Sequence, residues 1–231
     1  MKLPTLGLVV LLAALACGCA PVHGGAEDKP DEQSLALKNS QIHIELIRQM
    51  LANGQYYAAL AHVEDERRAS GPSDTLTLLD AEAQRHLGQR RQAEALYRQL
   101  LAGGEAAAAY HGLGLLYAQS NDLPSAVRSL GFAVQRAPTN VDYRNDLGYA
   151  LMQSGRYSEA MPELSTAAEL APNQARNRNN LIELMMLMGN EAAATRLAEE
   201  SGTTPAGMKR LREDAQAIRS RLSAASAKAA G

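Results

Sequence analysis

Aromatic residues are scarce in this 231-residue chain, which contains no tryptophan, one phenylalanine and 4% aromatic residues in total. Hydrophobic residues nevertheless make up 46% of the sequence, as expected of a folded protein. The core must therefore depend on alanine and leucine, which suits stacked helices. The formal net charge is only −2, so no overall positive field favours nucleic acid, and no nucleic-acid partner is expected.

Sequence motifs for catalysis are absent as well. The histidines form neither an HExxH motif nor a tight cluster with cysteines or carboxylates. No Gly-x-Ser-x-Gly elbow or glycine-rich phosphate loop occurs, because Gly112-Leu113-Gly114 belongs to a repeat described below. The paired carboxylates Asp65-Glu66 and Glu199-Glu200 are expected at helix ends, on solvent-exposed faces. These observations predict a protein that is not an enzyme and that uses neither a cofactor nor a metal ion.

The only two cysteines, Cys17 and Cys19, follow an apolar amino-terminal segment. Lys2 provides a basic start, and the segment from Leu6 to Ala16 is uncharged. Eleven apolar residues are too few to span a bilayer as a helix, but they suit the core of a signal peptide. The order of basic residue, apolar core, small residues and cysteine resembles a bacterial lipoprotein signal, in which the cysteine is lipidated and becomes the first residue.

The lipidated residue is expected to be Cys19, because Gly-Cys-Ala is a common junction in lipoproteins, with Cys17 as the alternative. An ordinary secretory signal with incidental cysteines is the competing interpretation. A Cys-x-Cys metal site is not indicated, since neither cysteine has a His or Cys partner at ligand spacing. Ala20 follows Cys19 where aspartate would retain a lipoprotein at the inner membrane. The resemblance therefore implies a lipid anchor at the outer membrane, on its periplasmic face.

A 34-residue pattern occurs twice in tandem, at 107–140 and 141–174. Alignment pairs Leu113 with Leu147, Gly114 with Gly148, Tyr117 with Leu151, Ala126 with Ala160, Leu130 with Leu164, Ala133 with Ala167 and Pro138 with Pro172. This pattern resembles the tetratricopeptide repeat (TPR), apart from Tyr110 and Arg144 where the family usually has tryptophan. The resemblance implies an all-α solenoid of helical hairpins, each of which buries its apolar face only by stacking on the next.

The spacing has a direct physical reading. Gly114 and Gly148 lack a side chain, so the second helix of each hairpin can lie close against the first. Leu130 and Leu164 are expected to fill the space beside them. Prolines at the end of each unit stop the second helix and turn the chain into the next unit.

The pattern continues with more substitutions on both sides, which gives about five units between residues 40 and 208. The expected units are 40–73, 74–106, 107–140, 141–174 and 175–208. Residues 1–19 are assigned to the signal, and residues 20–39 to a flexible tether rich in Pro, Gly and acidic residues that separates the repeats from the membrane by ~25 Å. Apolar residues with helical spacing predict a capping helix over 209–223, and 224–231 are expected to be a disordered tail.

First helices of TPR hairpins line a concave groove, which is the expected partner-binding surface. The residues assigned to this groove are His111, Leu115, Asn145, Tyr149, Met152, Asn179, Glu183 and Met186. Amides among them can bond a peptide backbone, and methionines adapt to varied partners. Met185 and Met188, in contrast, are assigned to the core between repeats. A second candidate docking surface is the basic C-terminal helix, with Lys209, Arg210 and Arg212, although a solvated helix face is the preferred interpretation of these charges.

Taken together, a lipoprotein signal, a tether and about five TPR units resemble the lipoproteins that assist assembly of bacterial outer-membrane secretion channels. Tight-adherence (Flp) pilus assembly proteins of the TadD type are the most similar family in architecture and size. The resemblance implies a non-catalytic interaction protein whose partner is the pilus secretin. The alternative is a TPR lipoprotein that scaffolds cell-wall enzymes, and the genes adjacent to this one would distinguish the two. TPR motifs specify the fold much better than the partner.

Overall fold

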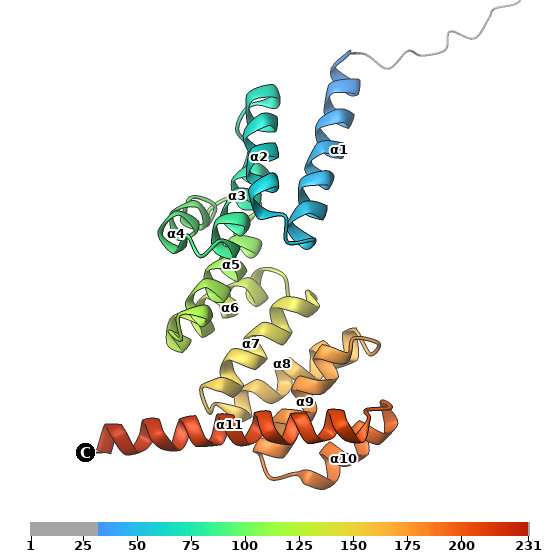
Figure 1. The fold of residues 1–231 in the computed structure, drawn as a ribbon, viewed down its shortest axis with the longest axis vertical. Coiled ribbons are helices and arrows are strands. Elements are labelled where there is room, and N and C mark those ends of the chain that lie inside the picture. The colour runs from blue at the N-terminus through green and yellow to red at the C-terminus, as the bar shows by residue number, and fades with distance from the viewer. Residues whose placement is uncertain (1–31, 231) are drawn as a thin grey trace, which may run out of the picture.

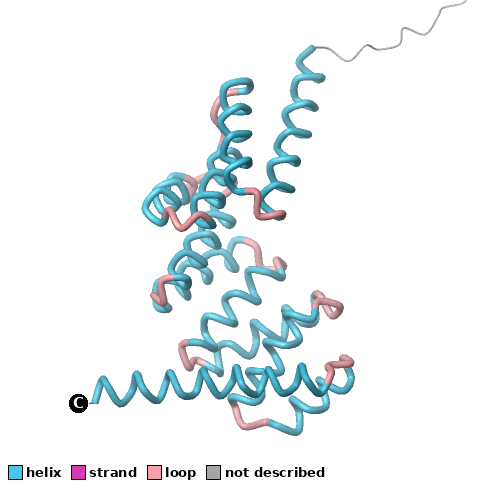
Figure 2. The backbone as a smooth tube through the Cα atoms, in the orientation of Figure 1, coloured by secondary structure: helices cyan, strands magenta, loops and turns pink. Residues whose placement is uncertain are grey.

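The computed structural model describes residues 32–230. Within that range the chain forms eleven α-helices joined by short turns, and it contains no β-strand (Figures 1 and 2). The helices are α1 (Glu32–Ala52), α2 (Tyr56–Ser70), α3 (Asp74–His86), α4 (Arg90–Gln99), α5 (Ala106–Gln119), α6 (Leu123–Arg136), α7 (Val141–Gln153), α8 (Tyr157–Leu170), α9 (Ala175–Leu187), α10 (Glu191–Glu200) and α11 (Pro205–Ala230).

The first ten helices form five hairpins that stack in chain order. Each odd-numbered helix from α1 to α9 packs against the helix that follows it. Each first helix from α3 to α9 also packs on the second helix of the preceding hairpin, so the hairpins form one continuous stack (Figure 1). Helices α6 and α8 end just before Pro138 and Pro172, as the helix-stopping role of these prolines predicts. The expected all-α solenoid of helical hairpins is therefore confirmed.

Gly114 and Gly148, the equivalent glycines of the two tandem units, lie at the contacts that the sequence predicted for them. A Cβ atom placed on Gly114 would lie 2.5 Å from Cγ of Leu130, and one on Gly148 would lie 2.6 Å from Cγ of Leu164. Both distances are far shorter than ordinary van der Waals contact, so only glycine fits without a shift of the neighbouring helix. Leu130 and Leu164 are fully buried there, at 1% and 0% exposure.

Small and branched aliphatic residues form the core in three clusters along the stack. One cluster joins α1, α2 and α3, a second joins α3, α4 and α5, and the largest extends from α6 to α11. Tyr97 is the one aromatic side chain among the largest fully buried residues of the described chain. Alanines such as Ala126 and Ala160 are completely buried. The expectation that alanine and leucine dominate the core agrees with this arrangement.

The ends of the described chain differ from the predicted boundaries. Helix α1 begins at Glu32, inside the segment 20–39 assigned to the tether, and α11 continues to Ala230, through the segment assigned to a disordered tail. Both segments contain residues with high helix propensity, mainly Ala, Leu, Lys, Glu and Gln, which explains the longer helices. The predicted signal peptide, including Cys17 and Cys19, lies outside the described residues.

Helix α11 does not extend the stack as a further repeat would. It lies against α9, the first helix of the fifth hairpin, whereas an additional repeat would place its first helix on α10. Leu211, Ala215 and Ile218 are buried in this contact, as their spacing predicted. In Figure 1, α11 crosses the lower end of the stack, and its carboxyl end projects beyond the other helices. It therefore covers part of the first-helix side of the solenoid.

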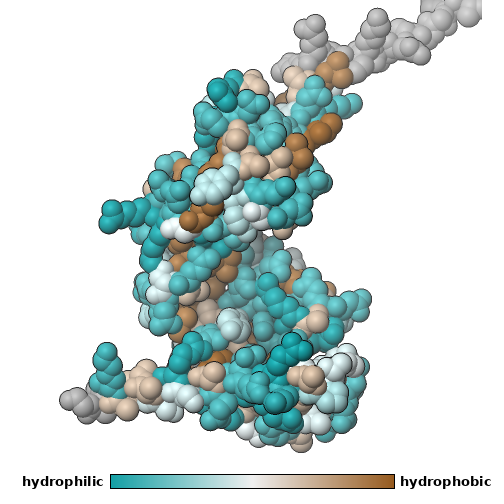
Figure 3. All heavy atoms as spheres, in the orientation of Figure 1, coloured by the Kyte–Doolittle hydropathy of each residue, from teal (hydrophilic) through white to brown (hydrophobic). Residues whose placement is uncertain are grey.

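The surface of the protein is largely hydrophilic in the view of Figure 3, with apolar side chains exposed along α1. Leu35, Leu37 and Ile42 are the most exposed of them, at 45%, 61% and 69%. Within residues 32–230, no helix combines the length and the apolar character that crossing a bilayer requires.

Candidate functional site

A pocket of about 640 Å³ lies between three helices, α7, α9 and α11. The two first helices contribute Asn145 and Tyr149 from α7, and Asn179 and Glu183 from α9. All four were assigned to the groove from the sequence, and the structure brings them together. Helix α11 supplies the remaining wall, so the predicted concave surface is a groove closed on one side by the C-terminal helix.

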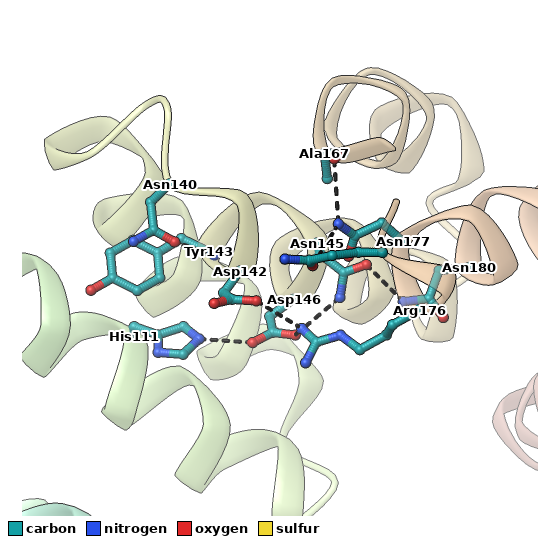
Figure 4. Close-up of polar contacts among 11 residues, drawn as sticks. His111, Asn140, Asp142, Tyr143, Asn145, Asp146, Ala167, Arg176, Asn177 and Asn180 are labelled. Atoms are coloured by element: carbon teal, nitrogen blue, oxygen red, sulfur yellow. Dashed lines mark hydrogen bonds and ion pairs between the residues drawn. The ribbon is translucent and has the colours of Figure 1, made fainter. Parts of the chain in front are cut away.

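A polar network runs along the groove from α5 to α9 (Figure 4). Asp146 is its centre. One carboxylate oxygen lies 2.7 Å from Nε2 of His111, and the other accepts a hydrogen bond of 2.6 Å from the Arg176 guanidinium. The side-chain amide of Asn180 donates to the side-chain oxygen of Asn145 at 2.9 Å. Three consecutive hairpins are thus linked by polar side chains on their first helices.

Two contacts in this network join positions 35 residues apart, although the repeat is 34 residues long. His111 contacts Asp146, and Asn145 contacts Asn180, each one residue past its repeat equivalent. Stacking rotates each first helix relative to the previous one, which brings the next residue into reach. His111 and Asn179 are partly exposed, whereas Asn145, their equivalent in the fourth unit, lies between them and is buried at 1% exposure.

The assignment of Met152 and Met186 to the groove is wrong. Both side chains belong to the largest core cluster, with 0% and 1% exposure. Each lies seven residues after an asparagine of its helix and therefore on nearly the same helix face. At the position of each methionine, however, this face packs against the neighbouring helices. The assignment of Met188 to the core is also wrong, because it caps α9 and is 48% exposed, while Met185 is partly buried against the core as expected.

Tyr149 lies at the centre of the groove. It is 41% exposed and lines the main pocket as well as a second one, of about 290 Å³, that Leu115 of α5 also lines. Burial of the rest of its ring raises the pKa of the Tyr149 hydroxyl, and the nearby Glu183 charge raises it further. The hydroxyl is therefore protonated at neutral pH and available as a hydrogen-bond donor.

Glu183 has the least ordinary environment in the pocket. It is only 4% exposed, and its Oε1 atom is buried without a hydrogen-bond partner in the described structure. Burial, and then the charge of Asp214 on α11, raise its pKa to about 7. About half of these carboxyl groups are therefore protonated at neutral pH.

Several groove residues were not identified from the sequence. Asp146 and Asn180 each follow an assigned asparagine by one residue, so a search one position beyond the repeat equivalents would have found them. Arg176 belongs to the weaker fifth unit, where the pattern is degenerate. Asp214 and Arg221 line the pocket from α11, and no repeat pattern indicates that this helix turns back to the groove.

A second polar cluster links α1 to α2. Glu66 is buried at 3% exposure, so its predicted place on a solvent face is wrong. Nδ1 of His43 lies 2.6 Å from its carboxylate, and Nε2 of His43 lies 2.8 Å from Nδ1 of His62. Burial alone would raise the pKa of Glu66, but hydrogen bonds from Ser40, Ser70 and His43 outweigh it and hold the pKa below its usual value. The cluster fixes α1 on α2.

Comparison with known proteins identifies the repeats. The family model described as tetratricopeptide repeat matches residues 111–175, which cover all but the first four residues of the tandem pair at 107–174. A TPR repeat-containing protein of Pseudomonas aeruginosa is 38% identical over 194 residues, covering 82% of this chain and 75% of that protein. Its similarity extends well beyond the two units that the family model matches.

Solved structures with the same fold include MamA and YrrB. The MamA AMB-1 structure has a TM-score of 0.54 at 22% identity, and covers 73% of this chain and 93% of its own. MamA from Desulfovibrio magneticus RS-1 has a TM-score of 0.57 at 15% identity, over 70% and 92% of the two chains. YrrB, described as a TPR protein with an unusual peptide-binding site, has a TM-score of 0.52 at 18% identity, over 69% and 82%. At these identities the likeness concerns the fold alone.

Proposed function

Since the chain belongs to the tetratricopeptide-repeat family, whose repeats form a scaffold for protein–protein interaction, we propose that its first-helix groove captures a peptide segment of a partner protein. The groove is the concave surface on which the pocket of about 640 Å³ lies. No step of this function requires chemistry, because the groove would act by holding its occupant in place.

The single observation that carries the proposal is the lining of the 640 Å³ pocket. Amide side chains from two consecutive hairpins, including Asn179 and Asn180, line it beside a half-exposed tyrosine. An extended peptide presents N–H and C=O groups at regular intervals, and an amide side chain can donate to one and accept from the other. Tyr149 offers a large contact area with few torsions to restrict on binding, as binding anchors often do.

Similarity to YrrB adds support, because that protein carries a peptide-binding site on the same kind of helical stack. The location of that site gives no residue assignment here. YrrB is a precedent for peptide capture by a helical stack of this architecture.

For the partner, we propose the secretin of a tight-adherence (Flp) pilus, whose assembly or localisation this protein assists. The support is the resemblance in architecture: a lipoprotein-type signal with Cys17 and Cys19, followed by a short stack of repeats. Lipid on Cys19, or on Cys17, would hold the protein at the periplasmic face of the outer membrane. The groove would then present a captured secretin segment close to the membrane in which the ring forms.

Co-purification of the secretin from detergent-solubilised outer membranes tests two proposals: that the groove captures the partner, and that the partner is the secretin. The test variant is Tyr149→Ala combined with Asn179→Ala, and we expect it to fold normally, recover much less secretin and reduce surface pili. Tyr57→Ala is the matched control, because Tyr57 is 75% exposed on α2, away from the pocket. Equal secretin recovery by wild type, control and test variant would remove the groove from the mechanism. Recovery of cell-wall enzymes in place of the secretin would instead identify the protein as their scaffold.

A further inference from the structure

One carboxyl group in the groove has an oxygen atom without a hydrogen-bond partner among the described residues. Glu183 is on α9 and lines the pocket, yet only 4% of the residue is exposed. Its Oε1 atom has no hydrogen-bond partner among the residues that the structure describes. Buried polar atoms are nearly always hydrogen-bonded, because losing water without compensation is costly. A group of this kind in a pocket wall indicates that the occupant supplies the missing partner.

The cations that line the pocket are engaged elsewhere. Arg176 donates to Asp146 at 2.6 Å and also lies 3.8 Å from Asp142. The Arg221 guanidinium donates to the side-chain oxygen of Gln153. Neither of them forms an ion pair with Glu183 in the described structure. The Arg221 charge lowers the pKa of Glu183, but burial and the Asp214 charge raise it by more.

A second carboxylate faces the same space from the opposite wall. Asp214 is on α11, lines the pocket and forms no ion pair within residues 32–230. Its charge is close enough to Glu183 to raise the pKa of that carboxyl. One cation placed between the two carboxyl groups would interact favourably with both of them.

We propose that Glu183 and Asp214 form an acidic subsite that receives one lysine or arginine side chain of the captured peptide. This proposal rests on the proposed function, because it names the chemistry of the groove's occupant. An ammonium or guanidinium group donates several hydrogen bonds and has no acceptor, which matches two carboxylates without donors. A metal ion fits less well, because residues 32–230 contain no group of three or more suitable ligands.

The subsite predicts a pH dependence of binding. The titratable and charged groups around Glu183 are Asp146 and Tyr149 on α7, Arg176 on α9, and Asp214 and Arg221 on α11. With the pKa of Glu183 at about 7, the carboxyl is partly protonated when the pocket is empty. Binding of a cation favours the ionised form, so a basic peptide binds more tightly as the pH rises from 6 to 8, and binding releases a proton.

Selection from a phage-displayed library of random peptides tests the subsite without knowledge of the natural partner. The bait is the full-length protein in detergent, and peptides are kept when Tyr149→Ala combined with Asn179→Ala weakens their binding. We expect the retained peptides to share a Lys or Arg at one position. Replacing that residue with Gln should weaken binding to wild type by roughly tenfold or more, which corresponds to ~1.4 kcal/mol.

The decisive measurement is a double-mutant cycle between peptide and protein. Glu183→Gln should reduce the affinity for the basic peptide by a similar factor and leave the affinity for its Gln variant unchanged. Glu199→Gln is the matched control, since Glu199 is exposed on α10, outside the pocket. Asp214→Asn, on the exposed side of α11, should cause a smaller loss in the same direction, and it serves as the test if Glu183→Gln does not fold.

The outcomes separate the two proposals. Retained peptides without a shared basic residue, or with one whose contribution survives both Glu183→Gln and Asp214→Asn, would overturn the subsite and leave the groove intact. A library that yields no peptide sensitive to the Tyr149 and Asn179 changes would overturn peptide capture itself, and the subsite with it.

Discussion

Replacing Gly148 with alanine tests the contact on which the repeat register depends. The added Cβ would lie 2.6 Å from Cγ and 2.7 Å from Cδ2 of Leu164, and 3.2 Å from the backbone nitrogen of the same residue. Leu164 is completely buried, and a change of its rotamer would not relieve the contact with its backbone nitrogen. The methyl group can therefore be accommodated only if α8 moves away from α7 along the centre of the solenoid.

The size of the effect follows from two opposing contributions. Overpacking at a rigid contact costs about 1–3 kcal/mol, whereas replacing a helical glycine with alanine gains about 1 kcal/mol of helix propensity. Gly131→Ala isolates the second contribution, because Gly131 is in α6 and a Cβ there meets nothing within 4 Å. The free energies of unfolding of the two variants should therefore differ by about 2 kcal/mol. For a domain of this size the melting temperatures then differ by roughly 4–8 °C.

Thermal unfolding followed by circular dichroism, on a fragment comprising residues 32–231, measures this difference. Gly131→Ala should melt at or above the wild-type temperature, and Gly148→Ala should melt below it. Gly148→Leu should lower the melting temperature further. If Gly148→Ala melts as high as Gly131→Ala, the close approach of α7 and α8 at this glycine is not real, and the register of the repeats is wrong.

Two further predictions concern the anchor and the buried carboxyl. Metabolic labelling with a palmitate analogue should mark the wild type and lose its signal when Cys17 and Cys19 are both changed to Ser, and label that persists in the double variant would refute the lipid anchor. The pKa of Glu183 in the folded protein is raised to about 7. Between pH 4.5 and 7 the folded protein therefore holds a proton that the unfolded chain releases. This group makes the protein less stable as the pH rises through that window. Glu183→Gln should therefore raise the melting temperature relative to wild type at pH 8 but hardly at pH 4.5, and an equal shift at both pH values would contradict the assignment.

Features that depend on contacts within one hairpin could be predicted from the sequence. Gly148 and Leu164 are 16 residues apart, and the turn between their helices is short, so the repeat pattern alone places them opposite each other. The same reasoning predicted Gly114 beside Leu130 and the helix ends before the prolines. In each case local spacing restricts the geometry to a single arrangement.

Contacts between hairpins depend on how successive first helices are oriented, which the repeat spacing does not specify. The groove assignments took positions 34 residues apart as equivalent, but stacking turns each first helix so that His111 meets Asp146 and not Asn145. The same rotation places Met152 between helices, although its sequence position suits the groove as well as the core. Small changes in interhelical angle decide whether such a side chain lies in the groove or in the core. These angles result from the packing of the whole stack.

Helix α11 shows a related limit. Its apolar stripe, with Leu211 and Ile218, was evident from the spacing, and these residues are buried. An apolar stripe predicts that a helix packs against a neighbouring helix, but it does not predict which one. In the structure α11 packs on α9. Asp214 and Arg221 therefore could not be placed in the pocket from the sequence.

The position of α11 also makes the pocket independent of the length of the solenoid. All three walls of the pocket come from residues after 140, so duplication or loss of a hairpin nearer the amino terminus would lengthen or shorten the stack without altering them. Insertion of a hairpin between α10 and α11 would instead lengthen the connection between α11 and α9. Gene rearrangement can therefore change the reach of this protein at its amino-terminal end without disturbing the pocket, whereas repeats added before α11 would separate α11 from α9.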